Sequence, residues 1–513
     1  MVARLLLIWR HSALFLAVAL LGYLHSSSAA AMNCADVDQI DVPGFPFDVT
    51  AAVSVPASVS NGINTPAHCR VEGEMERRTG ADGKSYAIRF ALALPTEWNG
   101  RLLFQGGGGL NGVLREPTGD RFAGDAGALT RGFAVVSNDS GHQAERPFDP
   151  SFFADQEALL NFLYRANERV ARMAKGVVAS YYAKSDFNAY FVGCSTGGRE
   201  AMIMSQRYPD IFNGIVAGAP AMRTNYSELG GLWSAVHLRT TNESGGSGDP
   251  RLSPAQREAV LEGVIAACDA QDGIADRMIF DIEGCAFDPT ELVCDSGEHC
   301  ITMDDADAIR TAFAGAKDSR GYEIYSPYPF DTGIDAGNPE KRELPGLLKA
   351  ASPPLSVSKL AKPVDWDAEA HAAADFPLAF GNTSEFEQIN GFSGRGGKLI
   401  FYHGVSDPWF SAFDTVRYYR NLAAANGGVD SLSSWSRLFL NPGVGHCAGG
   451  AMALDQVDLL TAIVDWVESD RAPASIEASG PAFPDRTRPL CPYPQFAHYA
   501  EGDAEKAEAF VCK

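Results

Sequence analysis

The sequence lacks a long apolar run anywhere after its first 30 residues, so no later segment is expected to span a bilayer. The early run, Leu14 to Leu24, is itself short for a membrane span and follows Arg4 and Arg10. Small residues up to Ala31 come next, and no polybasic segment that would retain a membrane anchor follows them. This pattern is typical of a secretory signal peptide. We therefore expect residues 1–31 to be removed and the mature chain to be secreted or periplasmic.

Positive charge is also scarce, with 42 Lys and Arg against 64 Asp and Glu and a formal net charge of −22. Loss of Arg4 and Arg10 with the signal removes two positive charges and takes the net charge from −22 to −24. Such an acidic surface argues against nucleic acid or an anionic membrane as the partner. It favours a neutral substrate, or a local basic pocket for an anionic one.

The ten cysteines lack the spacing of a zinc site, and an even number in an exported chain is typical of disulfides. The sequence alone does not determine their pairing. Joining neighbours along the chain predicts the pairs Cys34–Cys69, Cys268–Cys285, Cys294–Cys300 and Cys491–Cys512. Cys194 and Cys447 then remain.

No internal repeat or low-complexity tract is present, and six short apolar runs end in glycine-rich or turn-rich segments, as strands ending in loops do. These runs are residues 101–105, 132–137, 189–192, 214–217, 398–402 and 438–440. The helix-like stretches between them are residues 156–182, 199–208 and 457–467. This alternation predicts an α/β fold with a mostly parallel central sheet and an active site at the carboxyl ends of the strands.

Residues 221–395 depart from this pattern, because they are rich in Gly, Pro, Ser and Asp and contain four of the ten cysteines. We predict a lid domain inserted between two parts of the core, residues 32–220 and 396–513.

Gly193-Cys194-Ser195-Thr196-Gly197 matches Gly-x-Ser-x-Gly between a predicted strand and a predicted helix. A serine on such a sharp turn is strained, and flanking side chains would clash, which explains the glycines. The turn also directs backbone N–H groups at the reacting oxygen. The motif in this context predicts an α/β-hydrolase fold with Ser195 as nucleophile.

A serine hydroxyl needs a base, and the base needs an orienting carboxylate, in the chain order Ser, Asp, His in this fold. His446 follows a predicted strand near the C-terminus and is the expected base. Asp407 follows the strand ending at Tyr402 and is the expected acid, with Asp414 as the nearby alternative. Cys194 adjoins Ser195 and Cys447 adjoins His446, so a working triad would bring these two cysteines within bridging distance.

Around these residues the sequence resembles the tannase and feruloyl esterase family, which includes a mono(2-hydroxyethyl) terephthalate hydrolase. Its members carry Cys-Ser, a distant Asp and His-Cys, matched here by Cys194-Ser195, Asp407 and His446-Cys447. Further matching segments are Gly106–Gly109, Gly141-His142, and Arg207-Tyr208-Pro209 through Gly218-Ala219-Pro220. The resemblance covers nearly the whole mature chain. It implies hydrolysis of esters, chiefly of aromatic acids, and a Cys194–Cys447 disulfide.

Two N–H donors are expected to stabilise the tetrahedral oxyanion of acyl transfer. Thr196 is the expected first donor, and Gly107 or Gly108 of the tetraglycine loop the second. Trp409 and Phe410 directly follow the acid and are candidates to line an aromatic acyl pocket, with ordinary core packing as the alternative. No organic cofactor is expected, because we assign the glycine-rich loop to the oxyanion.

A carboxylate-rich loop in the predicted lid is a candidate calcium site, because calcium prefers six to eight oxygen ligands. Its expected ligands are the side chains of Asp269, Asp272 and Asp276 and the carbonyls of Ile274 and Met278. A solvated acidic loop is the alternative from the residues alone. The family resemblance implies a structural calcium ion, and a Cys268–Cys285 bridge would brace the loop.

Together these observations predict a secreted serine esterase acting on a small aromatic ester. The alternatives are acyl transfer or peptide cleavage on the same scaffold, and a non-catalytic relative that binds polyphenols or carbohydrates. The sequence does not indicate the oligomeric state.

Overall fold

The computed structural model describes residues 31–60, 63–146, 148–241, 247–335, 346–349 and 364–513. The expected signal peptide therefore lies outside the described residues except for Ala31. Within the described part of the chain, no helix combines the length and apolar character that a bilayer crossing needs.

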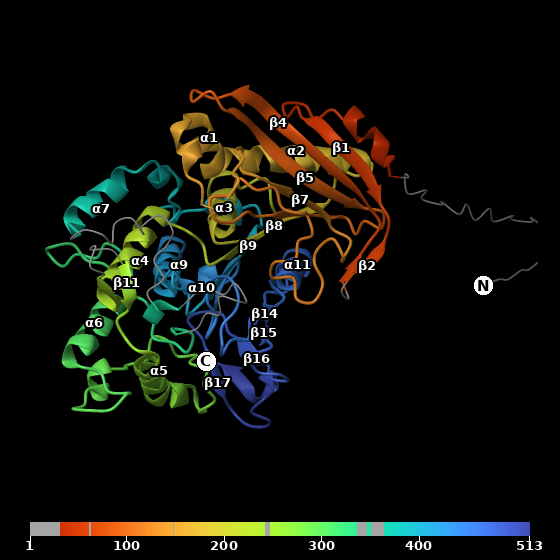
Figure 1. Cartoon of the computed structure of the whole chain (residues 1–513). Helices are drawn as coiled ribbons and strands as arrows, with labels where there is room; N and C mark the ends of the chain where they lie inside the picture. Colours follow the sequence, from red (N-terminus) through yellow and green to blue (C-terminus); the bar gives the residue numbers. More distant parts are fainter. Residues whose placement is uncertain (1–30, 61–62, 147, 242–246, 336–345, 350–363) are drawn as a thin grey trace, which may run out of the picture.

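A nine-stranded sheet forms the centre of the molecule (Figure 1), in the order β1-β4-β5-β7-β6-β8-β9-β12-β13. Its strands are β1 (Asp48–Val55), β4 (His68–Thr79), β5 (Ser85–Pro95), β6 (Arg101–Gln105), β7 (Ala134–Asn138), β8 (Asn188–Cys194), β9 (Gly214–Gly218), β12 (Lys398–Gly404) and β13 (Ser436–Asn441). From β7 to β13 the pairs are parallel, whereas β1, β4, β5 and β7 pair antiparallel. The six parallel strands are the six predicted apolar runs, and the predicted α/β class is confirmed.

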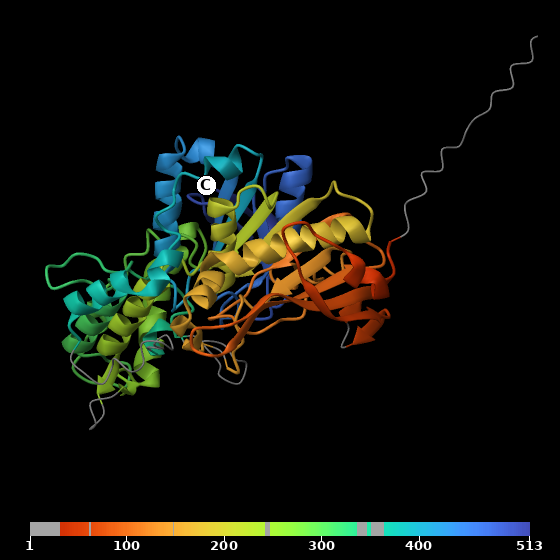
Figure 2. The same cartoon turned by 90° about the horizontal axis from the view of Figure 1, so that it is seen from above.

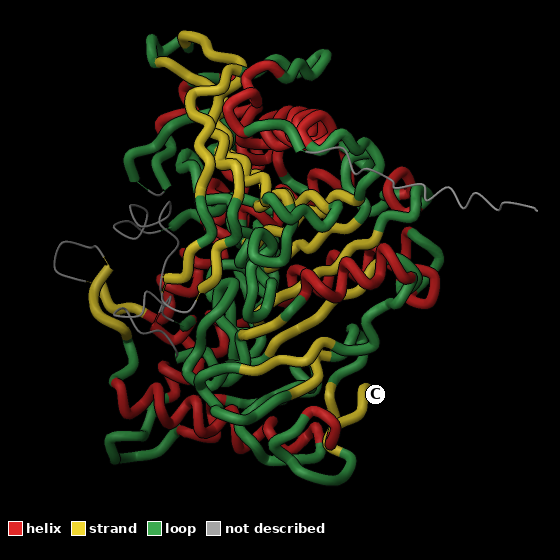
Figure 3. Tube along the Cα trace, turned by 90° about the vertical axis from the view of Figure 1, so that its right-hand side faces the viewer, coloured by secondary structure: helices red, strands yellow, loops and turns green. Residues whose placement is uncertain are grey.

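Helices cover both faces of the parallel strands, which explains why β7 and β9 are buried along their whole length. One face packs on α2 (Ala166–Tyr181), α3 (Thr196–Arg207) and α9 (Ala412–Ala425), and the other packs on α11 (Leu459–Ser469). Figure 2 shows α2 running along the sheet, and Figure 3 shows the strands passing between helices. The predicted helix over 156–182 is α1 (Gln156–Leu160), a π-helical turn η3 (Asn161–Arg165) and α2.

The segment between β9 and β12 builds a separate helical layer at one end of the sheet (Figure 1). It contains α4 (Thr224–Leu238), α5 (Pro254–Cys268), α6 (Met303–Phe313) and α7 (Trp366–Asp375), and these four helices share a hydrophobic core. Near the predicted end of this lid at residue 395, Phe392 of the short α8 (Asn390–Ser393) and the preceding Ile389 are buried in the core of the main sheet.

Small elements complete the chain. The short strands are β2 (Ser58–Ser60), β3 (Ile63–Thr65), β10 (Arg239–Thr241), β11 (Ser247–Pro250), β14 (Gln456–Val457), β15 (Ile476–Ser479), β16 (Arg488–Leu490), β17 (Ala497–Tyr499) and β18 (Phe510–Cys512). The remaining helical turns are η1 (Cys34–Gln39), η2 (Ser151–Ala154), η4 (Asp269–Asp272), η5 (Pro289–Leu292), η7 (Leu347–Lys349), η9 (Pro377–Gly381), α10 (Val429–Leu432) and η10 (Ala507–Ala509).

Disulfides join Cys34–Cys69, Cys268–Cys285, Cys294–Cys300 and Cys491–Cys512, which are the neighbour pairs expected from the sequence.

Candidate active site

Ser195 lies at the sharp turn between β8 and α3, with φ 66° and ψ −125°. This left-handed conformation is strained for a residue with a side chain. A Cβ at Gly193 would lie 2.3 Å from the Gly197 oxygen, and one at Gly197 would lie 2.7 Å from the Gly107 oxygen. Both positions therefore require glycine, as the predicted nucleophile turn does.

His446 and Asp407 are in direct contact, because Nδ1 of His446 lies 2.6 Å from Oδ2 of Asp407. The other carboxylate oxygen accepts the backbone N–H groups of Trp409 at 2.9 Å and Phe410 at 3.1 Å. Burial acts to raise the pKa of Asp407, but the charge of His446 and the hydrogen bonds from His403 and His446 hold it well below its usual range. The carboxylate thus stays ionised and fixes the imidazole ring.

His403 is a second histidine at this carboxylate, and the sequence analysis missed it. Its Nε2 lies 3.5 Å from Oδ2 of Asp407 and 2.9 Å from the carbonyl oxygen of Phe410. Its Nδ1 lies 2.8 Å from Oγ1 of Thr415. His403 is buried, so it supports the Asp407 loop from within the core. His403 lies within strand β12 and not in a loop after a strand, and its sequence context did not indicate a role at the site.

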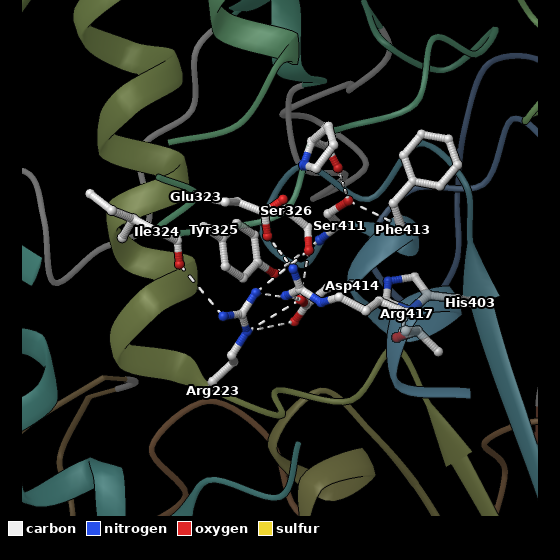
Figure 4. A network of polar contacts seen from close by, with 12 residues as sticks. Arg223, Glu323, Ile324, Tyr325, Ser326, His403, Ser411, Phe413, Asp414 and Arg417 are labelled. Carbon is white, nitrogen blue, oxygen red and sulfur yellow. Dashed lines mark hydrogen bonds and ion pairs between the residues drawn. The ribbon is translucent and has the colours of Figure 1, made fainter. Parts of the chain in front are cut away.

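Asp414, the alternative acid, belongs to a different network (Figure 4). It accepts hydrogen bonds from Arg223 at 2.6 Å, Arg417 at 2.5 Å and the hydroxyl of Ser326 at 2.8 Å. Arg223 precedes α4 of the inserted segment, and Ser326 also belongs to that segment, whereas Asp414 lies on α9. Asp414 therefore joins the lid to the core, and the contact with His446 is made by Asp407.

A disulfide joins Cys194 to Cys447, with 6.1 Å between their Cα atoms. Ser195 and His446, the residues beside these cysteines, line the same cavity. The sequence separation of the bonded pair is 253, so the bond fixes two distant loops at the carboxyl ends of β8 and β13.

The tetraglycine loop does not leave the expected N–H groups free to bind an oxyanion. Gly107 donates to Oε2 of Glu200 at 2.8 Å, and Gly108 donates to Oδ1 of Asn111 at 2.7 Å. Asn111 also donates to Oε1 of Glu200 at 2.5 Å. Both N–H groups that were expected to complete the oxyanion hole are therefore already bonded in this structure.

Gly109, the next residue of the loop, has an N–H group that is available. Its N–H has no hydrogen-bond partner among the described residues, and neither has that of Thr196. Gly109 has φ 61°, which glycine adopts readily, and its carbonyl oxygen accepts the hydroxyl of Thr196. Both residues line a cavity together with Ser195.

Two cavities meet at Ser195 and Trp409. The larger encloses about 660 Å³ between the tetraglycine loop, residues 118–125 and the His446 loop. The other is a narrow slot of about 30 Å³ toward α4, with Leu110, Phe148, Trp409 and Phe410 among its walls. The rings of Trp409 and Phe410 lie 5.1 Å and 5.2 Å from that of His446. The predicted aromatic pair is therefore placed against His446.

The carboxylate-rich loop is tightly folded. Asp269 accepts the N–H groups of Arg277 at 2.9 Å and Met278 at 3.1 Å, and Asp276 is paired with the buried Arg488. Asp272 is buried, and its Oδ2 has no hydrogen-bond partner among the described residues. Burial, and then the charge of Asp276, raise the pKa of Asp272 to about 7.

One of the expected ligands already has a cationic partner. Arg488, which the sequence did not predict at this loop, donates to Oδ2 of Asp276. Ile274 and Met278 lie in the same loop, and Met278 is buried. Among the described residues, no group of three or more His, Cys, Asp or Glu side chains is arranged to hold a metal ion.

Comparisons with known proteins identify relatives of this chain. The chain is 34% identical over 534 residues to mono(2-hydroxyethyl) terephthalate hydrolase from Piscinibacter sakaiensis, covering 90% of this chain and 87% of that protein. It is 30% identical to a probable feruloyl esterase from Arthroderma benhamiae, covering 95% of each. The crystal structure of feruloyl esterase B from Aspergillus oryzae superposes with a TM-score of 0.75 at 25% identity, covering 94% of this chain and all of that one.

A family model described as tannase and feruloyl esterase matches residues 69–343 and 379–513, which is well over half of the sequence. The matched regions include Ser195, Asp407 and His446. The chain belongs to the tannase and feruloyl esterase family.

Proposed function

We propose that this carboxylic ester hydrolase acts through Ser195 as nucleophile, His446 as base and Asp407 as the carboxylate that orients the base. The observation that carries the proposal is the 2.6 Å contact between His446 and Asp407, in a cavity that Ser195 also lines. Asp407 fixes the imidazole through Nδ1, which leaves Nε2 to exchange the proton of the serine hydroxyl.

The proposed reaction has two acyl-transfer steps. Oγ of Ser195 attacks the ester carbonyl while His446 takes its proton, and the oxyanion receives hydrogen bonds from the N–H groups of Thr196 and Gly109. The intermediate then expels the alcohol, which takes the proton from His446. Water, deprotonated by His446, attacks the acyl-enzyme in the same way and releases the acid.

The acid portion of the substrate is proposed to be aromatic. The slot beside Ser195 has aromatic walls suited to stacking on a planar ring. The buried Nε1 of Trp409 has no hydrogen-bond partner among the described residues and is suited to donate to a ring substituent. Relatives named as feruloyl esterases and as a terephthalate monoester hydrolase support this substrate class.

The test is covalent labelling with a fluorophosphonate probe, combined with hydrolysis of methyl ferulate, methyl gallate and mono(2-hydroxyethyl) terephthalate. Labelling and hydrolysis of at least one ester are expected in the wild type, and both are expected to vanish in Ser195→Ala. An unlabelled wild-type protein without hydrolysis would overturn the proposal. Labelled protein that transfers the acyl group to an added alcohol but not to water would indicate an acyltransferase instead.

We further propose that a structural calcium ion binds the loop of Asp269 and Asp272, because Asp272 holds a buried carboxylate oxygen without a partner among the described residues. An uncompensated buried carboxylate is costly, and a divalent cation would stabilise it. Secretion or periplasmic location is likewise proposed, from the signal-like N-terminus and from five disulfides, which persist in oxidising compartments.

A further inference from the structure

The larger cavity beside Ser195 contains two arginines, Arg115 and Arg121, in a protein whose net charge is −22. Both side chains are exposed to the space of the cavity. Arg115 lies against the tetraglycine loop, because a Cβ at Gly108 would be 3.0 Å from its Nη2. The guanidinium of Arg115 is therefore beside the loop that is proposed to bind the oxyanion, and Arg121 lines the same cavity.

Neither guanidinium makes an ion pair with any carboxylate in the part of the chain that the structure describes. Asp120, Asp125 and Asp455 also line this cavity, yet none of them lies within 4.0 Å of these two groups. Asp455 instead accepts the N–H of Gly449 at 2.8 Å. Many arginines of this acidic protein do have partners, as Arg131 has in Asp458 at 2.8 Å.

The lowered pKa of Arg121 also indicates that no nearby carboxylate balances its charge. Desolvation by the cavity walls lowers its pKa, and the like charge of Arg115 lowers it further, with only the phenol of Tyr402 acting in the opposite direction. The two cations repel each other, and neither has a carboxylate within 4.0 Å among the described residues. An anion bound between them would relieve this repulsion and form charge-assisted hydrogen bonds.

The narrow slot on the other side of Ser195 has the opposite character. Glu228 is one of its lining residues, together with Thr224 and Ser227, and none of the described residues that line it is cationic. A carboxylate on the alcohol portion would extend into the larger cavity toward Arg115 and Arg121.

We propose that Arg115 and Arg121 form an anion subsite for the alcohol portion of the ester, so that the enzyme prefers aromatic-acid esters whose leaving alcohol carries a carboxylate. This inference rests on the proposed function, because it assigns the slot to the acyl group and the larger cavity to the alcohol.

The test compares ferulate esters of glycolic, 3-hydroxypropanoic and 4-hydroxybutanoic acids with the corresponding primary amides. The ratio of kcat/KM for acid to that for amide is measured in the wild type, Arg115→Gln, Arg121→Gln and the double variant. Arg471→Gln is the matched control, because it removes one positive charge from an exposed side chain paired with Asp465, outside the residues that line the cavity.

For at least one chain length the ratio is expected to fall about tenfold in the double variant relative to both the wild type and Arg471→Gln, which is the scale of one charge-assisted hydrogen bond. In the wild type, 0.5 M NaCl is expected to reduce the ratio, because salt screens exposed charges. Each ratio comes from a single preparation, so the folded fraction cancels.

An unchanged ratio in the double variant at all three chain lengths would overturn the inference. It would also be overturned if the arginine dependence appeared only for charge on the acyl ring, measured with methyl esters of terephthalic acid and of its monoamide. Absence of Ser195-dependent hydrolysis of every ester would instead contradict the proposed function.

Discussion

The disulfide between Cys194 and Cys447 connects the residue before Ser195 to the residue after His446. The nucleophile turn follows β8 and the base loop follows β13, and this bond fixes their separation. Reacting groups held near productive geometry lower the barrier of the chemical step, because less ordering is needed during the reaction.

The Cys194→Ala, Cys447→Ala double variant is therefore expected to lose about tenfold in kcat, about 1.4 kcal/mol of barrier. Hydrolysis of methyl ferulate is measured on protein whose fold is checked by circular dichroism. The Cys294→Ala, Cys300→Ala variant is the control, because that bond closes a loop of sequence separation 6 in the lid. Equal kcat in the wild type and the Cys194, Cys447 variant would contradict the prediction.

Asp407 and Asp414 are distinguished by their partners. Asp407→Asn should lower kcat by about 10³ to 10⁴, because an amide keeps the shape of the carboxylate but does not stabilise the imidazolium. Asp414→Asn should instead lower the melting temperature, because Arg223 loses its partner between lid and core. Steady-state kinetics and thermal unfolding of both variants check this. A larger loss of kcat in Asp414→Asn than in Asp407→Asn would instead assign the role of the acid to Asp414.

The parallel half of the sheet was predictable because its strands are short apolar runs that end at glycines, as in Arg101–Gln105 before Gly106. The antiparallel strands β4 and β5 were missed. β4 includes charged residues such as Glu72 and Arg77, so it gives no continuous apolar run. Pairing of these strands is set by tertiary contacts, which a local pattern does not contain.

The candidate site shows the same limit at single residues. The order of motifs along the chain suggested Ser195, Asp407 and His446. It did not show that the N–H of Gly107 is bonded whereas that of Gly109 is available. That difference depends on Glu200, 93 residues from Gly107, which takes the N–H of Gly107. Arg488 likewise reaches Asp276 across 212 residues. Hydrogen-bond partners this distant follow from the fold and not from local spacing.

Chelation tests the proposed calcium site. Treatment with EDTA is expected to lower the melting temperature by several degrees, and calcium should restore it, because ligand binding to the folded state alone stabilises it. The kcat of protein that remains folded should hardly change, because the loop supplies none of the residues that line the two cavities at Ser195. Asp272→Asn should abolish the EDTA effect. A melting temperature insensitive to EDTA in the wild type would contradict calcium binding.

Asp139 gives a pH dependence of stability. Burial raises its pKa to about 7, against hydrogen bonds from Gln143, Gly141 and Arg89 that lower it. Because the folded pKa is above the unfolded value, the unfolded state loses this proton first as the pH rises. Asp139 therefore costs stability progressively between about pH 4 and about pH 7.

Asp139→Asn removes that cost. The variant should therefore be more stable than the wild type, by an amount that is larger at pH 8 than at pH 4.5. The difference between the two pH values, measured as the free energy of unfolding in urea, should be on the order of 2–4 kcal/mol. The same ionic strength at both pH values controls for screening of other charges. A difference between variant and wild type that does not change with pH would show that Asp139 titrates normally in the folded protein.

Glu200 and Asn111 hold the tetraglycine loop by complementary donors and acceptors. Glu200→Gln replaces one carboxylate oxygen by an NH₂ group, so an N–H of Gly107 or Asn111 loses its acceptor. We expect kcat to fall about tenfold with little change in KM, because a displaced Gly109 N–H would weaken stabilisation of the oxyanion more than substrate binding.

Adding Asn111→Asp to Glu200→Gln restores complementarity. The introduced glutamine amide can then accept from Gly107 and donate to the new carboxylate, which still accepts from Gly108. Recovery of most of the lost kcat in the double variant is expected, and Asn111→Asp alone should be as impaired as Glu200→Gln, because two carboxylates would then face each other. If the two single effects instead add in the double variant, Glu200 does not act by positioning this loop.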